Sequence, residues 1–222
     1  MDWTALRLSL ELALVTVAVL LPVGVLLGRT LAFRRFPGRG LVEALVALPL
    51  VLPPTVLGFY LLAALGAASP LGRLAEALLG RPLVFSFEGL VLASVIANLP
   101  FAVQPVQRGF EAIGVELRDA AAACGMPPLV RFLRVELPLA WPAIATGLVL
   151  VFAHTMGEFG VVLMVGGSIP GETRTMAIAI YDRVQAFDDR GAALLSAVLL
   201  AVALLAILAT FGFSRRVGRR LG

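Results

Sequence analysis

Residues able to do chemistry are few in this sequence, and their scarcity restricts what the protein can do. The chain has one histidine, His154, and one cysteine, Cys124, and all 18 of its basic residues are arginine. A single histidine and a single cysteine exclude a multi-histidine metal site, a cysteine cluster and an internal disulfide within one chain. The absence of lysine excludes Schiff-base chemistry and a P-loop, whose lysine grips a phosphate. We therefore expect no catalytic residue, metal or cofactor in this chain.

One carboxylate stands in an otherwise uncharged stretch: Glu158 is the single formal charge between residues 137 and 171. Such a residue at the bilayer centre costs about 2.5–3.5 kcal/mol and usually faces the interior of a helix bundle. Its negative charge would repel an oxyanion, so we do not assign it to substrate binding. We expect it to pair with an arginine or with His154, or to cap a broken helix beside Gly157 and Gly160. A satisfied interior pair with no gating role is an equally good interpretation.

The elements that carry these residues are predicted to be membrane helices. Sixty per cent of the 222 residues are apolar and 14% are charged, against about 45–50% and 25% in soluble domains. Uncharged runs long enough to cross a bilayer occur five times, at 12–28, 44–72, 89–107, 137–157 and 191–214. The second run is too long for one straight helix, so we expect its end near 66–70 to lie outside the bilayer. The sequence thus predicts an all-α polytopic membrane protein with about five transmembrane helices, and leaves room for a sixth, short or re-entrant one at 176–187.

The arginines indicate the orientation of these spans. Twelve of the 18 fall in the segments after spans one and three and in the C-terminal tail, which we take as cytoplasmic. We expect the N-terminus outside and the C-terminus in the cytoplasm, with the basic tail as a topology anchor at anionic lipid and not as a nucleic-acid site. The N-terminus lacks a basic leader, so we expect the first run to be a span and not a cleaved signal. The twelve arginines on the side taken as cytoplasmic are Arg29, Arg34, Arg35, Arg39, Arg108, Arg118, Arg131, Arg134, Arg215, Arg216, Arg219 and Arg220.

The segment 109–138 is an unusually long loop, rich in helix formers, in what reads as a single membrane domain spanning 1–222. Alanine fills most of 119–124 and favours a helix over 111–123. Gly125 should end this helix, and Pro127-Pro128 should prevent its return. Its small side chains suit close docking in a groove of a partner protein. The alternative is an ordinary amphipathic connector resting on lipid.

Span two carries Pro49, Pro53 and Pro54. Each proline removes a backbone donor, and broken helix at membrane depth is tolerated where it faces protein or a cavity. This favours span two as a lining of a pathway, and a harmless kink is an equally good interpretation.

Three stretches resemble the permease subunits of molybdate ABC importers. Asp119-Ala120-Ala121, Gly125, Val135 and Leu137-Pro138 match the spacing of the EAA loop of bacterial ABC-importer permeases, with Asp in place of Glu and Val in place of Ile. Residues 48–58 resemble the LPLVLPP segment of molybdate and sulfate permeases, and residues 157–160 and 168–175 resemble the pattern GEFG…IPGETRT. The likeness covers nearly the whole chain. Sulfate and thiosulfate permeases are close relatives, and tungstate is a near-isostere of molybdate.

This resemblance implies a type I ABC-importer permease fold of the MetI-like kind, in a bacterial or archaeal inner membrane. It implies a channel-forming subunit, not an enzyme, that moves molybdate or a similar tetrahedral oxyanion into the cytoplasm. The implied partners are a cytoplasmic ABC ATPase dimer that binds ATP and Mg, an external substrate-binding protein and a second copy of this chain. A secondary anion transporter and a membrane-embedded enzyme are the rival classes.

The resemblance and the residue patterns together assign three sets of residues. The set for coupling to the ATPase is Asp119, Ala120, Ala121, Gly125, Val135, Leu137 and Pro138. The set for the pathway or gate is Pro49, Pro53, Pro54, Thr55, Gly157, Glu158, Phe159 and Gly160. The set for docking of an external partner is Pro170, Gly171, Thr173, Arg174 and Thr175.

Overall fold

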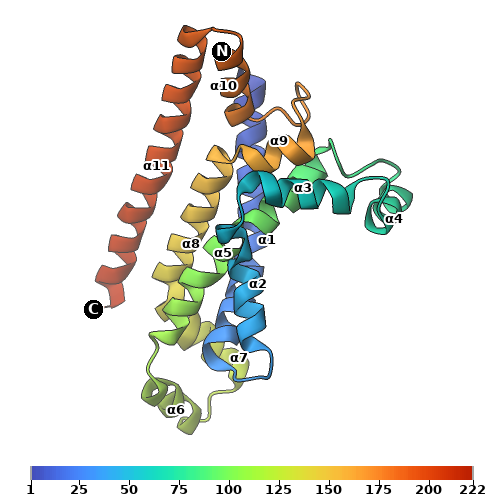
Figure 1. Ribbon diagram of the computed structural model, residues 1–222. Coiled ribbons are helices and arrows are strands. Elements are labelled where there is room, and N and C mark those ends of the chain that lie inside the picture. The colour runs from blue at the N-terminus through green and yellow to red at the C-terminus, as the bar shows by residue number, and fades with distance from the viewer. Residues whose placement is uncertain (1, 222) are drawn as a thin grey trace.

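Long helices make up the body of the protein (Figure 1). The computed structural model describes residues 2–221, with side chains described for residues 2–208. Helices α1 (Trp3–Phe33), α5 (Phe87–Glu111) and α8 (Leu137–Gly157) pack together, and α11 (Asp189–Leu221) packs along α8 and α10. The shorter elements are α2 (Arg39–Val51), α3 (Pro54–Leu65), α4 (Pro70–Leu79), α6 (Val115–Ala123), α7 (Pro128–Arg131), the π-helix η1 (Phe132–Glu136), α9 (Gly160–Gly166) and α10 (Met176–Gln185). In Figure 1, α6 and α7 lie at one end of the bundle and α10 at the other.

The number of spans agrees with the expectation of about five. Within the described residues, four helical segments are long and apolar enough to cross a membrane: Trp3–Phe33, Phe87–Glu111, Pro128–Gly157 and Asp189–Leu208. Helices α2 and α3 count as a fifth span if the pair is taken together, although they bend by 113°. Helix α3 ends at Leu65, close to the expected end of the span near 66–70. The span also breaks at its middle, where it bends sharply.

Two consecutive prolines cause that break. A proline disfavours helical backbone in the residue before it, so Pro53 acts on Leu52 and Pro54 acts on Pro53. Both residues are extended, with ψ of 136° at Leu52 and 137° at Pro53. Pro54 then opens α3, a position where its missing N–H is harmless. Isolated prolines do not interrupt the long helices, which contain Pro22 in α1, Pro100 and Pro105 in α5, and Pro142 in α8.

Small residues let α1 and α5 approach closely. A Cβ atom at Gly24 would lie 2.8 Å from the carbonyl oxygen of Ala102, and one at Gly28 would lie 2.9 Å from the backbone nitrogen of Gln107. Helices in lipid associate through such backbone contacts because no hydrophobic driving force holds them together. Helix α5 is thereby fixed against α1 as the centre of the bundle.

The long loop differs from the expected single helix over 111–123. Helix α5 continues to Glu111, and α6 begins only at Val115. The expectation that Pro127-Pro128 would prevent further helix was wrong, because Pro127 is extended and Pro128 is the first residue of α7. Helix α10 confirms the short helix expected at 176–187. The side chains of Arg215, Arg216, Arg219 and Arg220 lie outside the described residues.

Candidate coupling loop and translocation path

Helix α6 ends in a backbone motif that requires glycine. The N–H of Gly125 donates to the carbonyl of Ala122 at 2.9 Å, and the N–H of Met126 donates to that of Ala121 at 3.2 Å. This pair of bonds is the Schellman arrangement, which needs a left-handed residue just past the helix. Gly125 has φ of +73°, and nothing lies within 4 Å of the place where a side chain would begin. Backbone conformation, and not crowding within this chain, thus selects glycine here.

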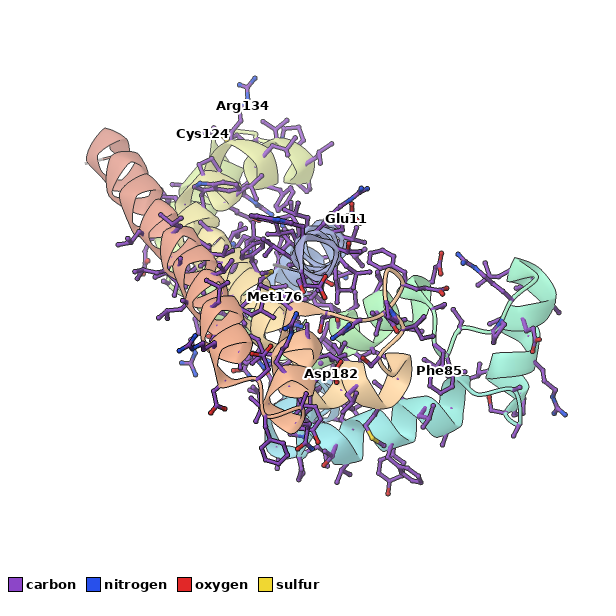
Figure 2. The ribbon with its side chains drawn as sticks, turned by 90° about the horizontal axis from the view of Figure 1, so that it is seen from above. Glu11, Phe85, Cys124, Arg134, Met176 and Asp182 are labelled. Carbon is purple, nitrogen blue, oxygen red and sulfur yellow. The ribbon has the colours of Figure 1, made fainter. Side chains whose placement is uncertain are left out.

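Most of the coupling residues on α6 face outward. Asp119, Ala120 and Gly125 are exposed, and Asp119 forms no ion pair with another described residue, whereas Ala121 is buried. Figure 2 places Cys124 and Arg134 at the same edge of the molecule, with Arg134 projecting away from the bundle. Exposed apolar side chains adjoin this surface at Val115, Leu117, Leu129 and Leu133. The remaining coupling residues Val135, Leu137 and Pro138 are half-buried where η1 joins α8.

Between Val135 and Leu137 lies a residue that the sequence reasoning missed. Glu136 is fully buried, and Nε of Arg29 on α1 donates to its Oε2 at 2.6 Å. Nε of Arg118 on α6 and Nε of Arg131 on α7 lie 3.5 and 3.4 Å from its Oε1. The EAA spacing leaves this position unspecified. The sequence feature that could have pointed to Glu136 is a charged residue directly before an apolar span.

Two of these arginines, Arg29 and Arg118, also stack on aromatic rings and so connect α1 with η1 and with α6. The guanidinium carbon of Arg118 lies 3.6 Å from the centre of the Phe33 ring on α1. That of Arg29 lies 5.1 Å from the centre of the Phe132 ring on η1. Cation–π contacts of this kind are stronger where water is excluded. The loop helix therefore contacts the end of α1 through one side chain.

A cavity of about 150 Å³ lies where the two helix breaks meet. It is lined by Pro49, Leu50, Leu52, Pro54, Leu57, Ala97, Phe101, His154, Glu158 and Val161. The α2–α3 break and the α8–α9 break pack directly on each other, since a Cβ at Gly160 would lie 2.7 Å from that of Pro54. The fold thus brings Pro49, Pro54 and Glu158 to one site, with Gly160 as their packing contact.

Glu158 caps a broken helix, as the sequence reasoning expected. It follows Gly157, the last residue of α8, with extended backbone, so the span ends where its uncharged run ends. Its Oε1 accepts from the backbone N–H of Val161 in the first turn of α9 at 2.9 Å, and its Oε2 lies 3.7 Å from Nε2 of His154. Nδ1 of His154 is 3.1 Å from Oδ1 of the buried Asn98. No arginine pairs with Glu158 among the described residues.

The other pathway candidates do not line this cavity. Pro53 and Thr55 are exposed at the α2–α3 break. Phe159 points toward α10, where its ring lies 4.8 Å from that of Tyr181. Gly157 lines a separate groove between α8, α10 and α11. Within the described residues, no group of three or more His, Cys, Asp or Glu side chains is arranged to hold a metal ion.

The external docking set is divided by the structure. Thr173 is buried and its hydroxyl accepts from the N–H of Ile169, and Thr175 is buried and caps α10. Their expected role in contacting an external partner is therefore wrong, because one buried hydroxyl closes the turn and the other caps α10. Pro170 and Gly171 are exposed and, with Arg174, line a cavity of about 300 Å³ beside Asp2. The guanidinium of Arg174 lies 3.0 Å from Asp182 and 3.9 Å from Asp2.

Known proteins similar to this chain match it along most of its length. The chain is 47% identical over 215 residues to the molybdenum transport system permease protein ModB of Azotobacter vinelandii, covering 97% of this chain and 95% of that one. It is 35% identical to ModB of Escherichia coli K12, covering 100% and 97%. It is 33% identical to the sulfate transport system permease protein CysT of Salmonella typhimurium, covering 89% and 71%.

Solved structures share the architecture at low sequence identity. A chain of a bacterial ABC transporter that imports the acidic polysaccharide alginate has a TM-score of 0.77 at 19% identity, covering 96% of this chain and 78% of that one. A chain of the MetNI methionine ABC transporter in an inward-facing conformation has a TM-score of 0.70 at 20% identity, covering 97% and 94%. The fold is therefore that of type I ABC-importer permeases. Residues 21–222 match one family as a whole, and the chain belongs to the binding-protein-dependent transport system inner membrane components.

Proposed function

We propose that this chain is the membrane-spanning subunit of an ATP-driven importer that moves molybdate into the cytoplasm. The observation that carries this proposal is the 47% identity to a molybdenum permease along nearly the full length of both chains. The resemblance in 157–160 and 168–175 to the molybdate permease pattern supports the same substrate. Tungstate and sulfate are the competing substrates, the latter because a sulfate permease is 33% identical.

The assembly proposed for this single domain of 1–222 contains two copies of the chain, a cytoplasmic ATPase dimer and an external binding protein. A second copy is supported by the small size of one helix bundle, which would need a partner to enclose a channel. It is also supported by exposed apolar side chains on α2 and α3, such as Leu45, Val51 and Phe59. In this proposal the N-terminus lies outside and the C-terminus inside, an orientation that the arginine asymmetry supports. Helix α6 is then cytoplasmic, and α10 is external.

In this arrangement ATP and Mg are bound by the partner ATPase, and this chain contributes a mechanical link. The exposed face of α6 with Asp119, Ala120 and Gly125 docks on the ATPase, and closure of the ATPase dimer draws the two α6 helices together. Binding of this kind can change the channel only if its two global states make different contacts with the ATPase. The cavity between the two helix breaks is the segment of the path where such a change would open or close it.

The test is a complex of this chain, its ATPase and its binding protein in proteoliposomes. ATP hydrolysis should rise when binding protein loaded with molybdate or tungstate is added, and should stay at its basal rate with sulfate. Stimulation of ATP hydrolysis by sulfate alone would contradict molybdate as the substrate and would identify the chain as a sulfate permease.

The rival class of secondary transporters is separated by the energy source. Uptake by the same proteoliposomes should persist when a proton ionophore is added at constant ATP. Uptake that collapses with the ionophore, and that proceeds without ATP, would contradict an ATP-driven importer.

A further inference from the structure

We propose that Glu136 is the positioning residue that transmits movement of α6 to the membrane helix α1. This inference rests on the proposed function, because it assigns the route by which docking at α6 reaches the channel. The residues concerned are Glu136 and the three arginines around it, Arg29, Arg118 and Arg131, which we name the Glu136 cluster.

The cluster joins helix α1, which is remote in the chain, to the consecutive loop elements α6, α7 and η1. Arg29 comes from α1, Arg118 from α6 and Arg131 from α7, and all three face one carboxylate on η1. Helix α6 otherwise packs on α7 and η1 alone among the contacts of more than marginal extent. A displacement of α6 therefore reaches α1 through Arg118, by way of Glu136 and the Phe33 ring.

The connection between α6 and α1 depends on the negative charge of Glu136. Three guanidinium groups surround one carboxylate, so the cluster carries an excess of positive charge even when Glu136 is ionised. Side chains of the three arginines are only 21–27% exposed, which leaves little water to screen their mutual repulsion. Loss of the carboxylate would drive the three elements apart, because like charges in a poorly solvated site repel strongly.

The two oxygens of Glu136 are bound unequally. Oε2 has a short hydrogen bond to Arg29, so the link to α1 is firm. Oε1 is buried without a hydrogen bond, and Nε of Arg118 and of Arg131 also lack one, although they lie within 3.5 Å of it. The side of the cluster that faces the loop therefore holds unused hydrogen-bonding capacity. A small shift of α6 can make or lose these bonds, as a two-state link between sites requires.

The experiment measures how strongly loaded binding protein stimulates ATP hydrolysis in the reconstituted complex. Glu136→Gln keeps the shape and removes the charge. It should leave the ATPase bound, since the outer face of α6 is unchanged, and should lower the stimulation by about tenfold. Arg118→Gln, at a partly exposed site, should have the same effect. The double variant should be no worse than the more affected single one, because both changes break the same link.

The matched control is Glu43→Gln on α2. Glu43 also pairs with an arginine, Arg39 at 3.0 Å, and accepts from Gln107 on α5, but among the described residues no hydrogen bond or ion pair joins it to α6, α7 or η1. Stimulation should stay within about twofold of wild type in this variant.

Several results would overturn the proposal: full stimulation in Arg118→Gln, equal loss in Glu43→Gln, or fully additive losses in the double variant. If Glu136→Gln fails to accumulate in the membrane, Arg118→Gln decides the matter alone. A wild-type complex that shows no stimulation would instead contradict the proposed function.

Discussion

Two buried carboxylates, Glu136 and Glu158, lie at the two ends of α8 and are stabilised in opposite ways. Glu136 is 0% exposed and Glu158 is 7% exposed. Glu136 is held by side chains from three other elements, one of them 107 residues away in sequence. Glu158 is held by a backbone N–H three residues later and by a histidine four residues earlier.

The difference concerns what each charge can control. A carboxylate bound by distant elements fixes their relative positions, and its loss affects the tertiary structure. A carboxylate bound by its own neighbours fixes a local break, and its loss affects the geometry of the α8–α9 junction. In the proposed account, the Glu136 cluster is therefore the part that transmits displacement, whereas Glu158 is the part that holds a bend.

Among the changes that test the contrast between Glu136 and Glu158, the largest expected effect is a loss of stability when Glu136 is replaced. Glu136→Leu leaves three poorly solvated guanidinium groups without their counter-charge and should lower the free energy of unfolding by about 3 kcal/mol. Thermal unfolding in detergent measures the change. Adding Arg29→Leu should recover part of it, because one uncompensated charge is then removed. If Glu136→Leu unfolds like wild type, the cluster does not hold the elements together.

Gly125→Asp should disrupt coupling while the membrane domain still inserts. A residue with a Cβ in the left-handed conformation costs about 1–2 kcal/mol, and the new carboxylate would enter the surface that meets the ATPase. The ATPase should dissociate, or its hydrolysis should become independent of loaded binding protein, as co-purification and proteoliposome assays measure.

A matched control for Gly125 exists at the end of α4. Gly80 has φ of +71°, and nothing lies within 4 Å of the place where its side chain would begin. Gly80→Asp therefore carries the same backbone cost at a site outside the loop, and stimulation should be retained. Full binding and full stimulation in Gly125→Asp would reduce 119–138 to an ordinary connector.

A smaller effect is expected at Glu158. Glu158→Gln keeps an oxygen that can accept from the N–H of Val161 and loses only the charge at the start of α9. Stability should fall by about 0.5 kcal/mol, and transport turnover should change while the preference among molybdate, tungstate and sulfate does not. Glu76→Gln, at an exposed position on α4, is the control. Normal turnover with an altered oxyanion preference would contradict a role in the bend.

The smallest effect concerns Asp188, a partly exposed counterpart of the Glu158 cap. The backbone N–H of Gly191 and the guanidinium of Arg183 lower the pKa of Asp188 below its usual value. A carboxylate with a lowered folded pKa contributes stability above its unfolded pKa and loses it as the pH falls through the folded pKa. Wild type should thus lose more thermal stability below about pH 4 than Asp188→Asn does. Parallel pH profiles of the two would show that this cap adds nothing.

Local features of this fold follow from the sequence more readily than long-range ones. The spans follow from uncharged runs, and the end of α6 follows from Gly125, because both depend on neighbouring residues. The break at Pro53-Pro54 was within reach of the same reasoning, since each proline acts on the residue before it. The end of α8 at Gly157 also follows from the sequence, because Glu158 ends the uncharged run 137–157 and a helix break beside Gly157 was expected.

The Glu136 cluster lies beyond local reasoning. Arg29 and Glu136 meet through the packing of α1 against α5 and α8, and no spacing rule connects residues 107 positions apart. Burial of Thr173 and Thr175 was missed for a different reason, since a polar turn sequence does not reveal which hydroxyls bond to their own segment.

The most direct test of a cytoplasmic α6 that docks an ATPase is the labelling of Cys124 by a membrane-impermeant maleimide. Cys124 is exposed at the end of α6, and it is the single cysteine of the chain. The account predicts labelling in inverted membrane vesicles, slower labelling when the ATPase is bound, and no labelling in intact cells, with Cys124→Ser silent throughout. Labelling of Cys124 in intact cells, or a rate in vesicles that the ATPase leaves unchanged, would contradict it.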